Sequence, residues 1–265
     1  MNTADAGSAD ILWDVQDGVA TITINRPEKR NAYNLAMLDQ MRELVLRAEN
    51  DPDVGVVVFT GAGDRAFCAG GDIQMEDDSN SRGARLLGQK AMAFSLAVRS
   101  SGIPVIAKVR GWCIGGGNEI NVICDLSIAA ESAKFAQAGP KMGSVPIWWG
   151  TQLLPRLVGD KRAKEIIMLC EPFTATEAQR MGWINKVVPD DELDAATRAW
   201  CDRLLSLSPQ ALRVAKHMLN MEADRQWPSV PVGFQYISFI HDTKEFHEGT
   251  SAFLEKRPAE FGPYR

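Results

Sequence analysis

The sequence is poor in the residues that build disulfide frameworks and metal sites. Its 265 residues include five cysteines and three histidines. The cysteines form no C-x-x-C pair and their number is odd, which favours reduced thiols over a disulfide framework. The histidines, His217, His241 and His247, do not match a metal-ligand spacing. We expect them to be solvated helix residues, and we predict no metal site.

Long apolar runs and long basic runs are also missing. No apolar run is long enough to span a bilayer, and the polar first five residues lack the positive and apolar segments of a signal peptide. The net charge is -5, and a nucleic acid is therefore an unfavoured partner. These absences together predict a cytoplasmic protein that binds neither membrane nor nucleic acid.

What is present is an ordinary globular composition, with 45% hydrophobic and 24% charged residues. Such a chain is long enough for a sizeable core. Residues 1–10 are expected to be a loosely held tail. After them, apolar strands alternate with helices, which predicts an α/β fold with parallel strands and crossover helices. We predict a core over residues 1–200 and a helical C-terminal region over 201–265.

Local signals place several element boundaries. Each combines a turn or capping residue with a change in hydrophobic period. Residues 74–83 are polar and are expected to form a loop before a helix over 84–100. The signals predict a hairpin turn at Asp17-Gly18, a helix N-cap at Asn34 and a capping box from Thr174 to Glu177.

Glycine-rich turns follow two apolar runs, 54–60 and 104–110, which have the pattern of strands covered on both faces. Glycine lets a backbone approach a ligand closely and orient its N–H groups freely. The second turn also opens a helix, which adds unpaired N–H groups and the positive end of the helix dipole. The N–H groups of Gly71 and Gly116 are predicted to meet as an oxyanion hole. Tight packing of strand against helix is the alternative explanation.

Glu119 lies about one turn inside the helix that follows the second glycine turn. A carboxylate there can reach a substrate at the hole and act as a general acid or base. The alternative is that it caps the N-terminus of its own helix. Asp72 is expected to cap the next segment or to bind backbone near the ligand. The basic pairs best suited to phosphate groups are Lys29-Arg30 and Lys256-Arg257.

With these residues, the chain resembles the enoyl-CoA hydratase/isomerase (crotonase) superfamily over nearly its whole length. Residues 135–144 are most similar to dihydroxynaphthoyl-CoA synthases and 2-ketocyclohexanecarboxyl-CoA hydrolases. The resemblance implies a crotonase-like spiral of ββα turns, an acyl-CoA substrate, and a trimer or a dimer of trimers. It is carried by Asn25-Arg26-Pro27-Glu28-Lys29-Arg30-Asn31-Ala32, Ala66-Phe67-Cys68-Ala69-Gly70-Gly71-Asp72, Gly115-Gly116-Gly117-Asn118-Glu119 and Phe253-Leu254-Glu255-Lys256-Arg257-Pro258.

The resemblance also implies roles for individual residues. The thioester carbonyl is expected between the N–H groups of Gly71 and Gly116, where an enolate is stabilised. Helices after residue 200 are expected to close the site, with Phe253 and Lys256 reaching the coenzyme A of a neighbouring subunit. Coenzyme A belongs to the substrate, and no separate cofactor is implied. The residues expected near it are Lys29, Arg30, Ala32, Ala69, Asp72 and Ile73.

The chain departs from typical hydratases at one catalytic position. Glu119 matches the first of their two glutamates, but the second falls at Gly139, which has no side chain. The synthases and hydrolases named above also have glycine there, with an Asp just downstream that this chain lacks. Trp148 and Trp149 lie in that stretch instead. We predict that they wall an apolar acyl pocket, unless both are core aromatics.

These residues predict a hydratase-type lyase that adds water to, or removes it from, a bulky acyl-CoA, with Glu119 as general base and acid. One alternative is a ring-opening C–C hydrolase, isomerase or decarboxylase acting on an acyl-CoA. The missing second carboxylate suggests another, a non-catalytic acyl-CoA-binding protein. A dinucleotide-binding fold is disfavoured, because neither turn has the G-x-G-x-x-G spacing.

Overall fold

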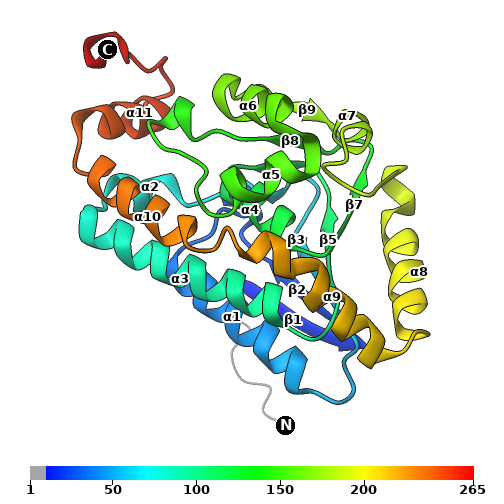
Figure 1. Cartoon of the computed structure of the whole chain (residues 1–265). Helices are drawn as coiled ribbons and strands as arrows, with labels where there is room; N and C mark the ends of the chain where they lie inside the picture. Colours follow the sequence, from blue (N-terminus) through cyan, green and yellow to red (C-terminus); the bar gives the residue numbers. More distant parts are fainter. Residues whose placement is uncertain (1–9) are drawn as a thin grey trace.

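Two sheets form the centre of the fold in the computed structural model, which describes residues 10–265 (Figure 1). The larger sheet has the order β1-β2-β3-β5-β7-β10 and the smaller has the order β4-β6-β8-β9. All neighbours are parallel except β1 with β2 and β8 with β9. The strands are β1 (Ile11–Gln16), β2 (Val19–Ile24), β3 (Val56–Gly61), β4 (Ala66–Cys68), β5 (Val105–Val109), β6 (Trp112–Ile114), β7 (Leu126–Ala130), β8 (Lys134–Ala136), β9 (Phe173–Thr174) and β10 (Lys186–Val188).

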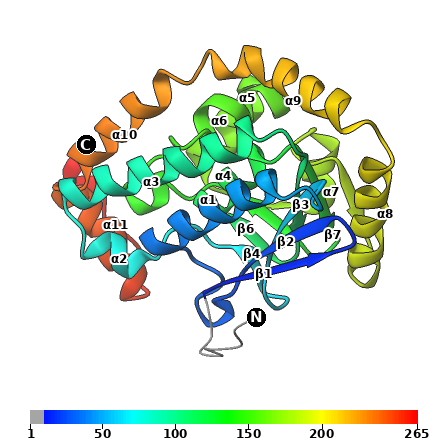
Figure 2. The ribbon, with the colours of Figure 1, turned by 90° about the horizontal axis from the view of Figure 1, so that it is seen from below.

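Helices surround the two sheets, and those of the C-terminal part form an arc around the core. Figure 2 shows this arc from α8 through α9 and α10 to α11. The α-helices are α1 (Leu35–Asn50), α2 (Ile73–Asp77), α3 (Ser81–Ser100), α4 (Gly116–Ile123), α5 (Gly150–Val158), α6 (Asp160–Leu169), α7 (Ala175–Arg180), α8 (Leu193–Leu205), α9 (Pro209–Asp224), α10 (Ser229–Ile240) and α11 (Lys244–Leu254).

The chain winds as a spiral in which each turn adds one strand to each sheet. The strand pairs are β3 then β4, β5 then β6, and β7 then β8. This confirms the expected α/β fold with ββα turns. Because β4 pairs with β6, with Cys68 opposite Cys113, the turns that follow these two strands lie next to each other. The spiral therefore brings together two glycine-rich segments that are more than 40 residues apart in the sequence.

Most predicted boundaries agree with the structure. The hairpin turns at Asp17-Gly18, Asn34 Oδ1 accepts the N–H of Met37 at 3.0 Å, and the capping box at Thr174 is present. The expected loop over 74–83 is wrong, because α2 and the start of α3 occupy most of it. The strands of the smaller sheet were not predicted, since two or three residues are too few to show a period. The expected tail lies outside the described residues, apart from its last residue.

One hydrophobic core joins the larger sheet to the C-terminal helices. Phe234 and Ile237 of α10 are buried in the same cluster as Phe59 of β3. Helix α10 packs against α3, and α3 against α1 (Figure 1). The domain boundary at residue 200 stays a prediction. Over residues 10–265, no helix is long and apolar enough to cross a membrane.

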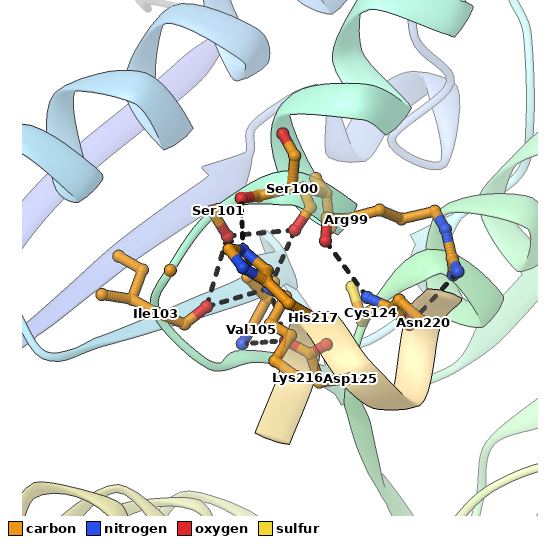
Figure 3. Close-up of polar contacts among 12 residues, drawn as sticks. Arg99, Ser100, Ser101, Ile103, Val105, Cys124, Asp125, Lys216, His217 and Asn220 are labelled. Carbon is orange, nitrogen blue, oxygen red and sulfur yellow. Dashed lines mark hydrogen bonds and ion pairs between the residues drawn. The ribbon is translucent and has the colours of Figure 1, made fainter. Parts of the chain in front are cut away.

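A buried cation joins α9 to this core. Lys216 is 7% exposed, and its Nζ donates to the carbonyl oxygens of Val98 and Ile103 at 2.8 and 2.9 Å (Figure 3). It also donates to Ser101 Oγ at 2.9 Å and pairs with Asp125 Oδ2 at 2.8 Å. One side chain of α9 thus binds the end of α3, the loop before β5 and the residue before β7.

Replacing this ammonium group is expected to destabilise the protein strongly. Lys216→Met leaves a carboxylate and buried acceptors without a partner, and we expect the free energy of unfolding to fall by about 3–5 kcal/mol. Urea unfolding measures the change. Lys164→Met, which breaks the exposed pair with Asp160, is the matched control, with an expected loss below ~1 kcal/mol. Equal losses for the two variants would contradict the anchoring role.

The two glycine turns are in backbone contact. A Cβ atom at Gly117 would lie closer than 3.0 Å to the carbonyl oxygen of Cys68, and one at Gly70 would lie 3.3 Å from the nitrogen of Gly116. Only glycine at position 117 lets α4 begin against the end of β4. The packing explanation therefore holds for Gly117, where the obstacle is backbone. At Gly71 and Gly116 a Cβ would instead meet side-chain atoms of Glu76 and Tyr33.

A methyl group at position 117 is expected to push the two turns apart. Gly117→Ala forces a backbone shift, which typically costs about 1–3 kcal/mol, and urea unfolding measures the loss. The control is Gly262→Ala, where a Cβ meets no atom within 4 Å and stability is expected to stay unchanged. A Gly117→Ala protein as stable as the control would show that the close contact is not required.

Candidate functional site

A cavity of about 120 Å³ opens beside the two glycine turns. Its walls come from both turns, from the segment 137–148, and from α3 and α10. The structure therefore brings together residues from distant parts of the sequence. The predicted site residues that line the cavity are Ala69, Gly71, Ile73, Gly116, Glu119 and Trp148.

In the described part of the chain, the N–H groups of Gly71 and Gly116 have no hydrogen-bond acceptor. Tyr33 makes the flanking bonds, since its N–H donates to Gly70 and its carbonyl accepts from Asp72, each at 2.9 Å. Gly116 is the first residue of α4, and the first N–H groups of a helix have no acceptor within it. Within residues 10–265, no backbone carbonyl outside the regular elements accepts from either group. Two available donors thus line one cavity.

Glu119 is buried at the same cavity, with an exposure of 6%. Its Oε1 accepts the N–H of Gly150, the first residue of α5, at 3.3 Å, so it does not cap its own helix. Burial raises the pKa of Glu119 well above its usual range. The hydrogen bond from Gly150 lowers this pKa in part, and the charge of Glu76 raises it further. The raised pKa favours the protonated form of this carboxyl group, which suits a group that exchanges protons.

No side chain fits at the position of the missing second glutamate. A Cβ at Gly139 would lie 2.8 Å from Cα of Val145 and 3.0 Å from the carbonyl oxygen of Ser144. The segment 144–146 therefore fills the space in which a carboxylate would stand.

The two tryptophans have different surroundings. Trp148 lines the cavity and meets Tyr33 edge-on, with ring centroids 5.9 Å apart. Trp149 is absent from the described residues that line it. It packs on Trp227 with centroids 5.8 Å apart, and the Arg99 guanidinium lies 4.6 Å above its ring. The positive φ of 68° at Trp149 turns the chain, so that the second indole belongs to the core.

The residues expected around coenzyme A differ in exposure: Ala69 and Ile73 line the cavity, whereas Lys29 is exposed. Asp72 does not cap α2 by its side chain. Its carboxylate binds Arg26 at 3.0 Å and Lys29 at 2.7 Å. Burial alone would raise its pKa, but these hydrogen bonds together lower it. Arg30 is exposed and Ala32 is buried.

Phe253 and Lys256 lie at and just beyond the C-terminal end of α11. Both side chains are exposed, and Phe253 is 55% exposed. Neither is among the described residues that line the cavity. Their expected contact with a neighbouring subunit stays a prediction.

Sequence reasoning missed four polar residues of the cavity wall. The Tyr33 hydroxyl and a Glu76 carboxylate oxygen occupy the space that a Cβ would need at Gly116 and Gly71. Gln137 is fully buried, and neither atom of its amide group has a partner. Glu76 lies one helical turn after Asp72. This spacing was not used as a signal, because residues 74–83 were expected to form a loop. The four residues are Tyr33, Glu76, Gln137 and His241.

His241 overturns the expectation that all histidines are solvated. It is 2% exposed, and its ring stacks on Phe246 with centroids 4.0 Å apart. Burial lowers its pKa to about 4, so the imidazole is neutral at physiological pH. His217 is exposed and His247 half-buried.

Comparisons with known proteins agree with the fold. The enoyl-CoA hydratase/isomerase family model matches residues 14–263. An enoyl-CoA hydratase structure from Mycobacterium avium subsp. paratuberculosis K-10 is 30% identical with a TM-score of 0.88, covering 96% of this chain and 98% of its own. A carnitinyl-CoA hydratase structure from Mycobacterium avium is 31% identical with a TM-score of 0.85, with the same coverage. The chain therefore belongs to the enoyl-CoA hydratase/isomerase family.

Proposed function

We propose that the protein is a hydratase-type lyase that adds water to the double bond of an enoyl-CoA thioester, or removes it in the reverse direction. The observation that carries this is the position of Glu119. A buried carboxyl group lines the same cavity as the unused N–H groups of Gly71 and Gly116. Two donors for an oxyanion beside one proton-transfer group are what enolate chemistry on a thioester requires.

In this proposal the thioester oxygen accepts hydrogen bonds from Gly71 and Gly116. Addition of water oxygen at Cβ moves negative charge onto that oxygen, and the enolate is then protonated at Cα. Donors already in place stabilise this charge, and losing one typically costs about 3 kcal/mol. Glu119 exchanges the protons, as general base toward water and as general acid toward carbon. One carboxyl group can fill both roles when the bound substrate places Cα and Cβ next to it.

The coenzyme A part and the acyl end of the substrate are each proposed to contact residues of suitable chemistry. The coenzyme A part is proposed to lie near Lys29, Arg30, Ala32, Ala69, Asp72 and Ile73, with Phe253 and Lys256 reaching it from a neighbouring subunit of a trimer. Lys29 is half exposed and already paired with Asp72, so it offers a phosphate only part of its charge. Trp148, Phe234 and Ile237 make the acyl end of the cavity apolar.

Replacing the acid is expected to separate binding from turnover. Glu119→Gln keeps the shape of the side chain but cannot transfer a proton, so kcat should fall at least ~100-fold while the Kd for a CoA ester stays within about twofold. Mass spectrometry for the gain of water follows the product. Glu131→Gln, an exposed glutamate outside the described cavity wall, is the control. Near-normal turnover by Glu119→Gln would overturn the assignment.

The same product analysis decides between hydration and the other reactions. A cleaved ring or a loss of CO₂ would replace hydration by C–C bond chemistry. Tight binding of acyl-CoA with no turnover of any ester would make the protein a binding protein. Either result rejects the proposed reaction, and the second also rejects the catalytic role of Glu119.

Cavity size predicts the acyl group. A protein cavity of about 150 Å³ holds one benzene molecule, and this cavity measures about 120 Å³. Because this volume is smaller than that of the benzene-binding cavity, we expect short-chain enoyl-CoA esters to react faster than ringed or long-chain ones, in place of the bulky acyl group expected from the sequence. Trp148→Phe is expected to shift kcat/KM toward larger esters. A wild-type preference for long chains would contradict this.

A further inference from the structure

We infer that Glu76 is the second acid–base residue of this site and replaces the carboxylate that position 139 lacks. The inference rests on the proposed hydration. The starting point is the missing second carboxylate, because position 139 has no space for a side chain. A carboxylate for the second proton transfer must therefore enter the cavity from another element, and α2 supplies it.

The geometry places Glu76 against the first oxyanion donor. Its side chain lines the cavity, and its Oε1 fills the space that a Cβ at Gly71 would need. Helix α2 begins directly after that turn, so the residue that donates to the thioester and the carboxylate belong to one short segment. A thioester bound at Gly71 would lie beside this oxygen.

Glu76 and Glu119 form a pair of carboxyl groups at one cavity. They come from the two helices that follow the two glycine turns, and the charge of Glu76 contributes to the raised pKa of Glu119. Burial raises the pKa of Glu76 to about 7, with a further contribution from Asp72. Among residues 10–265, no hydrogen bond or cation acts against this shift. A group in this state changes its charge near the pH of the cell, which suits a general base.

With two carboxyl groups at the cavity, the proton transfers that the proposed function gives to Glu119 alone are divided between Glu119 and Glu76. Ionised Glu76 takes a proton from water as the water oxygen bonds to Cβ, and the electrons of the double bond move to the thioester oxygen. Protonated Glu119 then gives its proton to Cα, which restores the carbonyl. The product has gained one water, and the proton on Glu76 returns to Glu119 through solvent. Pairs of titrating groups whose environments hold them in different states are how one site supplies both an acid and a base.

Other titrating groups face this pair, and the pH prediction takes them into account. On its own segment Glu76 has Asp72, whose pKa is lowered. From α11, which packs on α2, His247 lies 3.6 Å from Asp77 rather than at Glu76. The titratable groups that line the cavity are Tyr33, whose pKa burial raises, His241, whose pKa burial lowers to about 4, and Glu119. Glu76 is the one among them placed to titrate near pH 7.

The experiment compares pH profiles of hydration for the wild type, Glu76→Gln and Glu119→Gln. Below about pH 7 Glu76 is protonated and cannot act as a base, so wild-type kcat/KM should fall about tenfold per pH unit as the pH decreases. Glu76→Gln should lose at least ~100-fold in kcat, with KM changed less than threefold, and should lose this limb of the profile. Asp78→Asn, an exposed carboxylate at the end of the same helix, is the control and should keep both rate and profile.

The outcomes separate this role from the proposed reaction. If the wild type hydrates the ester and Glu76→Gln matches it, or keeps the limb near pH 7, the role of Glu76 is overturned and the hydration stands. If the wild type binds but hydrates no ester, the proposed function fails and this role with it. If Glu76→Gln does not fold by circular dichroism, Glu76→Asp decides. It retains a carboxylate at a greater distance, and an unchanged rate and profile for this variant would overturn the inference.

Discussion

The site depends on one backbone contact, that of the second glycine turn against the end of β4. Gly117 lies so close to the Cys68 carbonyl that no side chain fits between them. The contact is possible because β4 and β6 are neighbours in a sheet of very short strands. It places the first N–H of α4 beside the turn that holds Gly71. Everything proposed for the chemistry follows from this contact, because two N–H groups on different loops share one cavity only if both loops are held by packing.

Burial sets the protonation states around that cavity. A carboxyl group removed from water binds its proton more tightly unless a cation or several donors compensate. Backbone N–H groups of Gly150 and Trp148 only partly offset the burial of Glu119, and among the described residues none offsets that of Glu76. Asp72, only a few residues away, has two cations and the opposite shift. The pKa values of three acids in one region therefore shift in two directions, upward for Glu119 and Glu76 and downward for Asp72, and the difference comes from their neighbours.

The sequence was most informative where a local pattern determines local structure. The glycines, the capping residues and the position of Glu119 could all be read from short segments. Trp149 could not be assigned, because its direction depends on a positive φ that forms only in the folded loop. Gln137, His241 and Glu76 were missed for a related reason. They reach the cavity through tertiary contacts between distant elements, and the spacing of residues along the chain does not show such contacts.

The C-terminal helices complete the cavity, and their attachment links stability to the site. Phe234, Ile237 and His241 reach the cavity from α10 and its end, but α10 continues from α9. The position of α9 is set in turn by the contacts of Lys216, which tie it to α3 and to the residues just before β5 and β7. A loss of that buried ammonium would therefore act at a distance. It would loosen the helix that carries the apolar wall, while the two backbone donors would stay in place.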